Sequence, residues 1–88
     1  MPTISMFYGI IIRMYFAPKE HNPPHIHAYY NEYKISLNIK TLEFMEGNMP
    51  RKQKRLIQAW AELHSEELLA DWELAMNGES IYQIPPLT

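Results

Sequence analysis

The sequence predicts an α+β fold, in which an antiparallel sheet of three to four strands (residues 3–46) packs on one face against two helices from residues 51–77. Three observations support this. Apolar residues alternate with a period of two before Pro50, and they recur with the helical period after it. Two neighbouring segments have apolar faces that match as a hairpin. The 88 residues suit a single domain, residues 1–88.

The first two strands are expected between residues 3 and 16. Residues 3–8 form a short strand, and Gly9 provides the bend that follows it. Residues 10–16 form the second strand, because every other residue from Ile10 to Phe16 is apolar. Residues 17–24 contain three prolines, which cannot donate to a strand ladder, so they are expected to form a loop.

Residues 25–30 and 33–39 are expected to form a hairpin around Asn31-Glu32. A two-residue turn pairs Tyr30 with Tyr33 and fixes the rest of the register. The apolar residues of the two strands then lie on one face, and the polar residues lie on the other. The polar pairs are His25 with Asn38, His27 with Ser36, and Tyr29 with Lys34. If the strand at residues 10–16 joins this sheet, Arg13 and Tyr15 share the polar face.

The rest of the chain is expected to be mainly helical. A short edge strand at residues 42–45 precedes a turn at Glu46-Gly47-Asn48, and Pro50 suits a first helical turn. Leu56, Trp60 and Leu63 form an apolar stripe that breaks near His64 and resumes out of phase. Ser65 is expected to cap the second helix, Asn77-Gly78 to end it, and residues 84–87 to form an extended tail.

Composition restricts the possible functions. The absence of cysteine excludes disulfides, thiolate metal sites and cysteine nucleophiles, and it suits a reducing cytoplasm. The formal charge of −2 gives no overall attraction to nucleic acid or anionic membranes. The apolar stretch at residues 1–12 is too short for a membrane span and lacks a basic leader. We expect a soluble cytoplasmic protein with no membrane partner.

The candidate site is a histidine motif. Residues 21–27 contain three of the four histidines, His21, His25 and His27, around Pro23-Pro24. Histidine acts as a general acid or base near neutral pH and as a metal ligand. On a strand, His25 and His27 point to the same face, with their Cα atoms about 6.7 Å apart.

Four interpretations of the motif remain open. The first is a metal site with His25 and His27 as ligands and His21, His64 or Glu67 as the third. Only two ligands are assured, so we expect no tightly bound metal and no cofactor. The second is metal-independent cleavage of RNA by two imidazoles. The third is a structural corner whose imidazoles bond to backbone carbonyls. The fourth is a docking surface for a protein.

For RNA cleavage, the expected catalytic residues are His25, His27, Arg13 and Tyr15. The residues expected to bind RNA are His21, Tyr29, Lys34, Asn38, Arg51, Lys52, Lys54 and Arg55. The last four form a basic cluster, which either binds phosphate or is a solvated helix face. Ser36 lies opposite a histidine, but no acid is placed to complete a serine hydrolase triad.

Several segments together resemble the domain of unknown function 4160 family: Pro2-Thr3-Ile4-Ser5, Ile12-Arg13-Met14-Tyr15-Phe16, His-x-Pro-Pro-His-x-His-Ala at residues 21–28, Trp60, Leu63-His64, Glu67-Leu68-Leu69 and Trp72-Glu73. The resemblance covers essentially the whole chain. It implies a small, stand-alone bacterial protein encoded beside a second small protein, as in a toxin–antitoxin module. It implies no catalytic residues.

Together, the motif and the resemblance lead us to expect the toxin-like member of such a module, acting on RNA as a metal-independent ribonuclease. Its partner would then be a small antitoxin-like protein encoded nearby. The alternative is a non-catalytic module whose histidine face docks a partner protein.

Overall fold

Within residues 2–16 and 23–88, which the computed structural model describes, five strands precede two helices. The strands are β1 (Thr3–Phe7), β2 (Ile10–Arg13), β3 (His25–Tyr30), β4 (Tyr33–Asn38) and β5 (Phe44–Asn48). The helices are α1 (Arg51–Leu63) and α2 (Ser65–Met76). The α+β class is therefore confirmed, whereas the expected three to four strands become five among the described residues.

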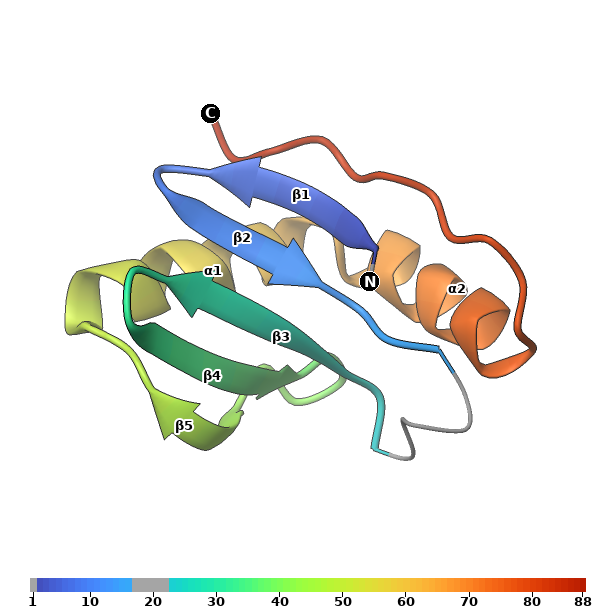
Figure 1. The fold of residues 1–88 in the computed structure, drawn as a ribbon, viewed down its shortest axis with the longest axis horizontal. Helices are drawn as coiled ribbons and strands as arrows, with labels where there is room; N and C mark the ends of the chain where they lie inside the picture. Colours follow the sequence, from blue (N-terminus) through green and yellow to red (C-terminus); the bar gives the residue numbers. More distant parts are fainter. Residues whose placement is uncertain (1, 17–22) are drawn as a thin grey trace.

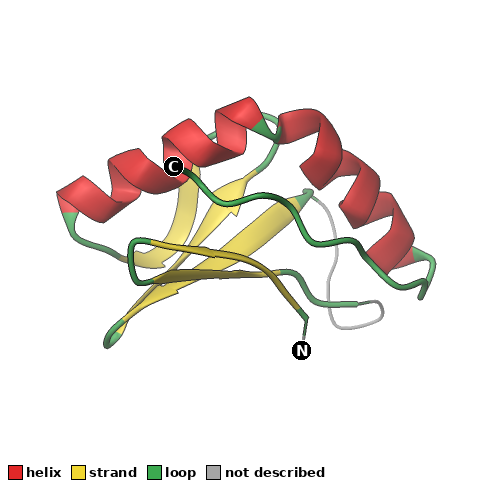
Figure 2. Cartoon of the chain, turned by 90° about the horizontal axis from the view of Figure 1, so that it is seen from above, coloured by secondary structure: helices red, strands yellow, loops and turns green. Residues whose placement is uncertain are grey.

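The strands form one antiparallel sheet in chain order, β1 to β5 (Figure 1). Both helices lie on the same face of this sheet (Figure 2). Because side chains alternate along a strand, every second residue of β2, β3 and β4 faces the helices. Neither α1 nor α2 covers the other face of the sheet, which we call the open face.

The β3–β4 hairpin has the expected register, from His25 opposite Asn38 to Tyr30 opposite Tyr33. Asn31 adopts a positive φ of 52° in the turn, a conformation that asparagine tolerates better than most residues. The first hairpin, β1–β2, turns at Tyr8 and Gly9, with φ values of 49° and 79°. Gly9 thus forms part of the expected bend, and Tyr8 belongs to the turn rather than to the strand.

Strand β5 corrects the expected turn at residues 46–48. Those residues continue the strand, and Gly47 pairs with Ile35 of β4. The register shifts between Ile35 and Leu37, as in a β-bulge. The sequence did not predict the full length of β5. Four of its five residues are exposed, so it lacks the apolar alternation of a half-buried strand.

The core lies between the sheet and the helices. In α1 the buried residues are Ile57, Trp60 and Ala61, and both tryptophans of the chain belong to the core. The expected stripe was wrong at Leu63, which is 71% exposed. At about 100° per residue, Leu63 points well away from the line of the buried residues Ile57, Trp60 and Ala61.

The helices meet at His64, as expected. Ser65, however, is the first residue of α2, and His64 occupies the N-cap position without a side-chain cap bond, so the expected cap at Ser65 was wrong. The end of α2 is a Schellman motif, in which the amides of Gly78 and Glu79 donate to the carbonyls of Ala75 and Leu74. Gly78 has the positive φ, 73°, that this motif favours.

The C-terminal segment runs along β1 (Figure 1). The Ile84 amide donates to the Ile4 carbonyl at 2.8 Å, and Ile84 is buried. The Trp60 indole N–H donates to the Pro85 carbonyl at 2.8 Å. The expected extended tail is therefore packed against both layers.

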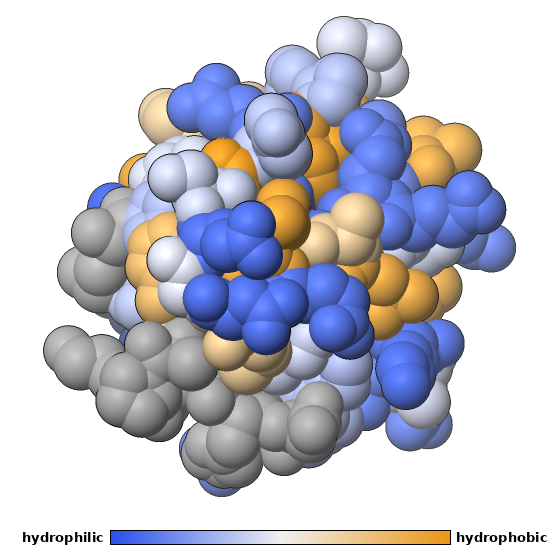
Figure 3. All heavy atoms as spheres, turned by 90° about the vertical axis from the view of Figure 1, so that its right-hand side faces the viewer, coloured by the Kyte–Doolittle hydropathy of each residue, from blue (hydrophilic) through white to orange (hydrophobic). Residues whose placement is uncertain are grey.

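At the end of the molecule where α2 lies, hydrophilic side chains are interspersed with apolar ones (Figure 3). Neither described helix is long and apolar enough to cross a membrane.

Candidate functional site

Polar side chains from adjacent strands form rows across the open face. Arg13 of β2 pairs with His27 of β3, and His27 pairs with Ser36 of β4. Paired residues on neighbouring strands share a face and lie close enough to interact. The Arg13 Nε also donates to the Thr3 hydroxyl at 3.4 Å, which extends this row to β1.

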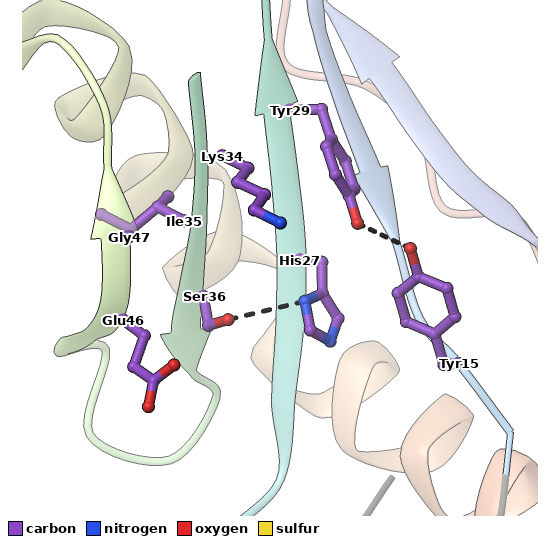
Figure 4. A pocket seen from close by; sticks show the side chains of 8 residues that line it. All are labelled: Tyr15, His27, Tyr29, Lys34, Ile35, Ser36, Glu46 and Gly47. Carbon is purple, nitrogen blue, oxygen red and sulfur yellow. Dashed lines mark hydrogen bonds between the residues drawn. The ribbon is translucent and has the colours of Figure 1, made fainter. Parts of the chain in front are cut away.

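A pocket of about 430 Å³ opens on this face. Figure 4 shows His27, Ser36 and Glu46 on three adjacent strands, with Lys34 above them in the view and the two tyrosines on the far side of β3. The lining residues are Tyr15, His27, Tyr29, Lys34, Ile35, Ser36, Glu46 and Gly47. Four of them, Tyr15, His27, Tyr29 and Lys34, were expected site residues.

The tyrosines form one wall of the pocket. The hydroxyls of Tyr15 and Tyr29 are hydrogen-bonded at 2.6 Å, and the Arg13 guanidinium lies 5.4 Å from the centre of the Tyr29 ring. The edge-to-face contact between Tyr15 and His27 has a centroid distance of 4.8 Å. Edge-to-face ring pairs of this kind are favourable, so these contacts stabilise the wall.

Charged groups of both signs line the pocket. Lys34 and Glu46 are exposed, and neither side chain forms a salt bridge or hydrogen bond with another described residue. Both can therefore interact with a ligand without first breaking an internal ion pair.

His25 differs from His27 although both belong to β3. His25 is 8% exposed and does not line the pocket. Its Nδ1 lies 2.8 Å from the Pro23 carbonyl oxygen, and since a carbonyl only accepts, Nδ1 carries the proton. This is the backbone-carbonyl contact that the structural interpretation expected. The His25 ring also contacts His27 at 5.0 Å and Trp72 of α2 at 5.2 Å.

Within residues 2–16 and 23–88, no serine hydrolase triad is formed around Ser36 and His27. Ser36 Oγ lies 3.5 Å from His27 Nδ1, the long limit for a hydrogen bond. Glu46 supplies an acid near Ser36, but Ser36 lies on the strand between Glu46 and His27. A triad requires the imidazole between the serine and the acid.

The other expected binding residues lie elsewhere. The Asn38 side chain accepts bonds from the amides of Lys40 and Thr41, so it shapes the turn after β4. The basic cluster of residues 51–55 forms the start of α1 and does not line the pocket. Within it, Lys54 lies 5.3 Å from the ring of Phe44. His21 falls outside the described residues.

Glu46 is the acidic pocket residue that the sequence analysis did not predict. It was assigned to a turn because Glu46-Gly47-Asn48 has turn composition. The available signal was Gly47 itself, since an isolated glycine beside a strand also marks a bulge or a close backbone approach.

Asp71, a residue with a shifted pKa, lies outside this pocket. Burial raises the pKa of Asp71 in α2, and the nearby Glu67 raises it further, whereas the bond from the Tyr82 amide opposes the shift. The Asp71 Oδ2 is buried and has no hydrogen-bond partner. We therefore expect the protonation of Asp71 to affect the stability of the fold rather than the chemistry of the pocket.

No group of three histidine or acidic side chains within residues 2–16 and 23–88 is arranged to hold a metal ion. His27 and Glu46 are the potential ligands that line the pocket.

Comparison with known proteins identifies the chain at the level of a family. The model of a domain of unknown function, DUF4160, matches residues 9–73, from the β1–β2 turn into α2. Searches of curated proteins and of solved structures gave no match. The matched segment includes Arg13, Tyr15, His27, Lys34 and Glu46. Because it spans well over half of the sequence, the chain belongs to the DUF4160 family.

Proposed function

We propose that the pocket on the open face binds single-stranded RNA and cleaves it without a metal ion. One observation carries the proposal: an imidazole, an ammonium group and a carboxylate line the same pocket beside two tyrosine rings. RNA cleavage needs a general acid, a general base and a cation, and single-stranded bases stack on aromatic side chains. The pocket supplies all four.

In the proposed reaction, the Glu46 carboxylate accepts the proton of a ribose 2′-hydroxyl, and the 2′-oxygen attacks the adjacent phosphorus. The bond between phosphorus and the 5′-oxygen of the next nucleotide breaks. His27, as the imidazolium, donates its proton to that oxygen. The products are a 2′,3′-cyclic phosphate and a free 5′-hydroxyl, so no water or metal enters this step.

The separation of the two groups suits this role. Glu46 and His27 lie on strands with β4 between them. Neighbouring strands are about 4.8 Å apart, so the two backbones are roughly 10 Å apart, which leaves space for a phosphodiester between the side chains. Glu46 takes the second role that we had expected of His25, because His25 does not line the pocket.

Lys34 and Arg13 provide positive charge beside this space. Lys34 lines the pocket, and Arg13 borders it through Tyr29 and His27. Cations placed where charge develops in the transition state lower the barrier more than they strengthen substrate binding. Tyr15 and Tyr29 offer ring surfaces for the adjacent bases.

The test is cleavage of a short single-stranded RNA by untagged protein in the presence of EDTA. We expect a cyclic phosphate product, and His27→Gln should lower the rate by about 10²–10⁴-fold. His64→Gln is the matched control, because His64 lies at the helix junction, where it contacts Glu67. The same oligonucleotide with a 2′-deoxy cleavage position should stay intact. Equal rates for wild type and His27→Gln would reject the proposal.

At the level of the cell, we propose that the protein is the toxin-like member of a toxin–antitoxin module and acts on cytoplasmic RNA. Expression alone should then arrest growth, and co-expression of the small protein encoded beside it should relieve the arrest. His27→Gln should restore growth at an equal protein level. Growth arrest by His27→Gln would show that toxicity does not depend on the pocket and would contradict this proposal.

The alternative is a non-catalytic module whose open face docks that neighbouring protein. Apolar surface beside the pocket favours it: Met6 is 62% exposed and pairs with Ile11, which pairs with Tyr29. This alternative predicts a stable complex of fixed stoichiometry, no RNA cleavage and normal growth. Met6→Lys should weaken that complex, because it places a charge in the apolar part of the interface.

A further inference from the structure

A row of ring contacts connects helix α2 to the pocket. Trp72 of α2 contacts His25, His25 contacts His27, and His27 contacts Tyr15, with centroid distances of 5.2, 5.0 and 4.8 Å. Exposure increases along this row, from 2% at Trp72 and 8% at His25 to the half-buried His27. One end of the row is therefore fixed in the core, and the other end borders the pocket.

His25 is held in place from two directions. Its Nδ1 donates to the Pro23 carbonyl at 2.8 Å, and its ring packs against Trp72, which belongs to the core cluster. The ring of His27 also contacts Tyr15, and its Nδ1 lies 3.5 Å from the Ser36 hydroxyl. An imidazole that must deliver a proton needs a fixed orientation, because misplacement of a reacting group by about 1 Å can cost 10²-fold in rate.

We infer that His25 is a positioning residue, which fixes the imidazole of His27 through the packing of its ring between His27 and Trp72. The inference rests on the proposed function for its effect on the reaction, and on the ring contacts for its effect on the structure. It replaces the expected catalytic role of His25 by an indirect one, and it makes α2 part of the machinery of the site.

Two substitutions test separately the contributions of the His25 ring and of its hydrogen bond. His25→Phe keeps an aromatic ring but loses the donor to the Pro23 carbonyl. His25→Asn keeps an amide donor near the position of Nδ1 but loses most of the ring. If ring packing orients His27, His25→Phe should keep at least half of the wild-type kcat. His25→Asn should lower kcat by about 10-fold or more, with KM for the RNA within about twofold.

The chain offers a matched control for a histidine packed on a tryptophan. His64 contacts Trp60 with a centroid distance of 5.6 Å, away from the pocket residues. His64→Asn removes the same kind of contact and should leave kcat unchanged. Trp72→Phe should resemble His25→Phe in activity, because the smaller phenylalanine ring reduces the contact with His25 without removing it.

A measurement without RNA tests the same inference. Nuclear Overhauser effects between the ring protons of His27 and Tyr15 should be retained in His25→Phe and lost or averaged in His25→Asn, in protein that remains folded. Unchanged effects in His25→Asn would overturn the inference, as would a His25→Phe variant as inactive as His27→Gln. If wild type does not cleave RNA but the effects change as expected, the proposed function fails and the positioning role stands.

Discussion

At the scale of single residues, Gly47 shows how the backbone determines one edge of the pocket. A Cβ at this position would lie 2.2 Å from the Lys34 carbonyl oxygen and 2.7 Å from the Ile35 Cα. Its φ of 115° is also one that residues with a side chain rarely adopt. Both neighbours are backbone atoms, which cannot move aside without displacing β4. Gly47 thus allows β5 to approach β4 closely enough to bring Glu46 to the pocket.

We predict that Gly47→Ala destabilises the protein more than Gly78→Ala. Gly78 also has a positive φ, but a Cβ there would meet nothing within 4 Å. Gly78→Ala should therefore cost only the conformational penalty, about 1–2 kcal/mol. Gly47→Ala should cost a further 1–3 kcal/mol or so for the clash. Urea unfolding monitored by tryptophan fluorescence gives both free energies of unfolding. Equal losses would show that the close approach of β5 is not needed.

At the scale of elements, the sequence predicts best where both faces of a strand have distinct environments. The two-residue turn predicted the β3–β4 register, and the apolar pairs Ile26–Leu37 and Ala28–Ile35 supported it, because a slip by one residue would expose them. Strand β5 has no buried face, so its sequence carries no such pattern. Glu46 was missed for the same reason. The depth of His25 was missed because alternation predicts the face of a residue, but not whether a helix packs over its end of the strand.

The C-terminal segment is an element in its own right, since it covers the outer edge of β1. An uncovered edge strand presents unpaired backbone groups to other chains. We predict that Ile84→Asp releases this segment, because burial of a charge beside Ile4 is unfavourable. The free energy of unfolding should fall by about 2 kcal/mol or more. The Trp60 fluorescence should shift to the red as its indole N–H loses the Pro85 carbonyl.

The matched control for this prediction is Gln83→Asp, which places the same charge on an exposed neighbour. Ile84→Asp should also increase self-association at high concentration in analytical ultracentrifugation, and Gln83→Asp should not. A monomeric Ile84→Asp variant with unchanged fluorescence would show that the segment does not protect β1.

At the scale of the whole molecule, the C-terminal segment joins the two layers. It bonds to β1 through Ile84, to α1 through Pro85 and to α2 through Tyr82. The last of these contacts uses the Asp71 carboxylate, whose Oδ1 accepts the Tyr82 amide at 3.1 Å while Oδ2 lies buried without a partner. A titratable group therefore lies where the helices and the C-terminal segment meet.

We predict that this arrangement makes stability depend on pH. Burial, with a further contribution from Glu67, raises the pKa of Asp71 in the folded state above its value in the unfolded chain. Between these two pKa values the folded state holds a proton that the unfolded state has lost. The contribution of Asp71 is therefore fully present below the unfolded pKa and is lost as the pH rises through the folded pKa. Asp71→Asn remains neutral and lacks this dependence.

The free energy of unfolding of Asp71→Asn minus that of wild type should therefore increase as the pH rises above the pKa of an aspartate in the unfolded chain, about 3.9. Urea unfolding at several pH values measures this difference directly. Glu67→Gln should make the increase smaller, because it removes the second cause of the raised pKa. Glu73→Gln is the control, since Glu73 is an exposed acidic residue of the same helix and is not among the causes of the shift. A difference that stays constant as the pH rises would mean that Asp71 has the same pKa in the folded and unfolded states, and that its burial does not oppose its charge.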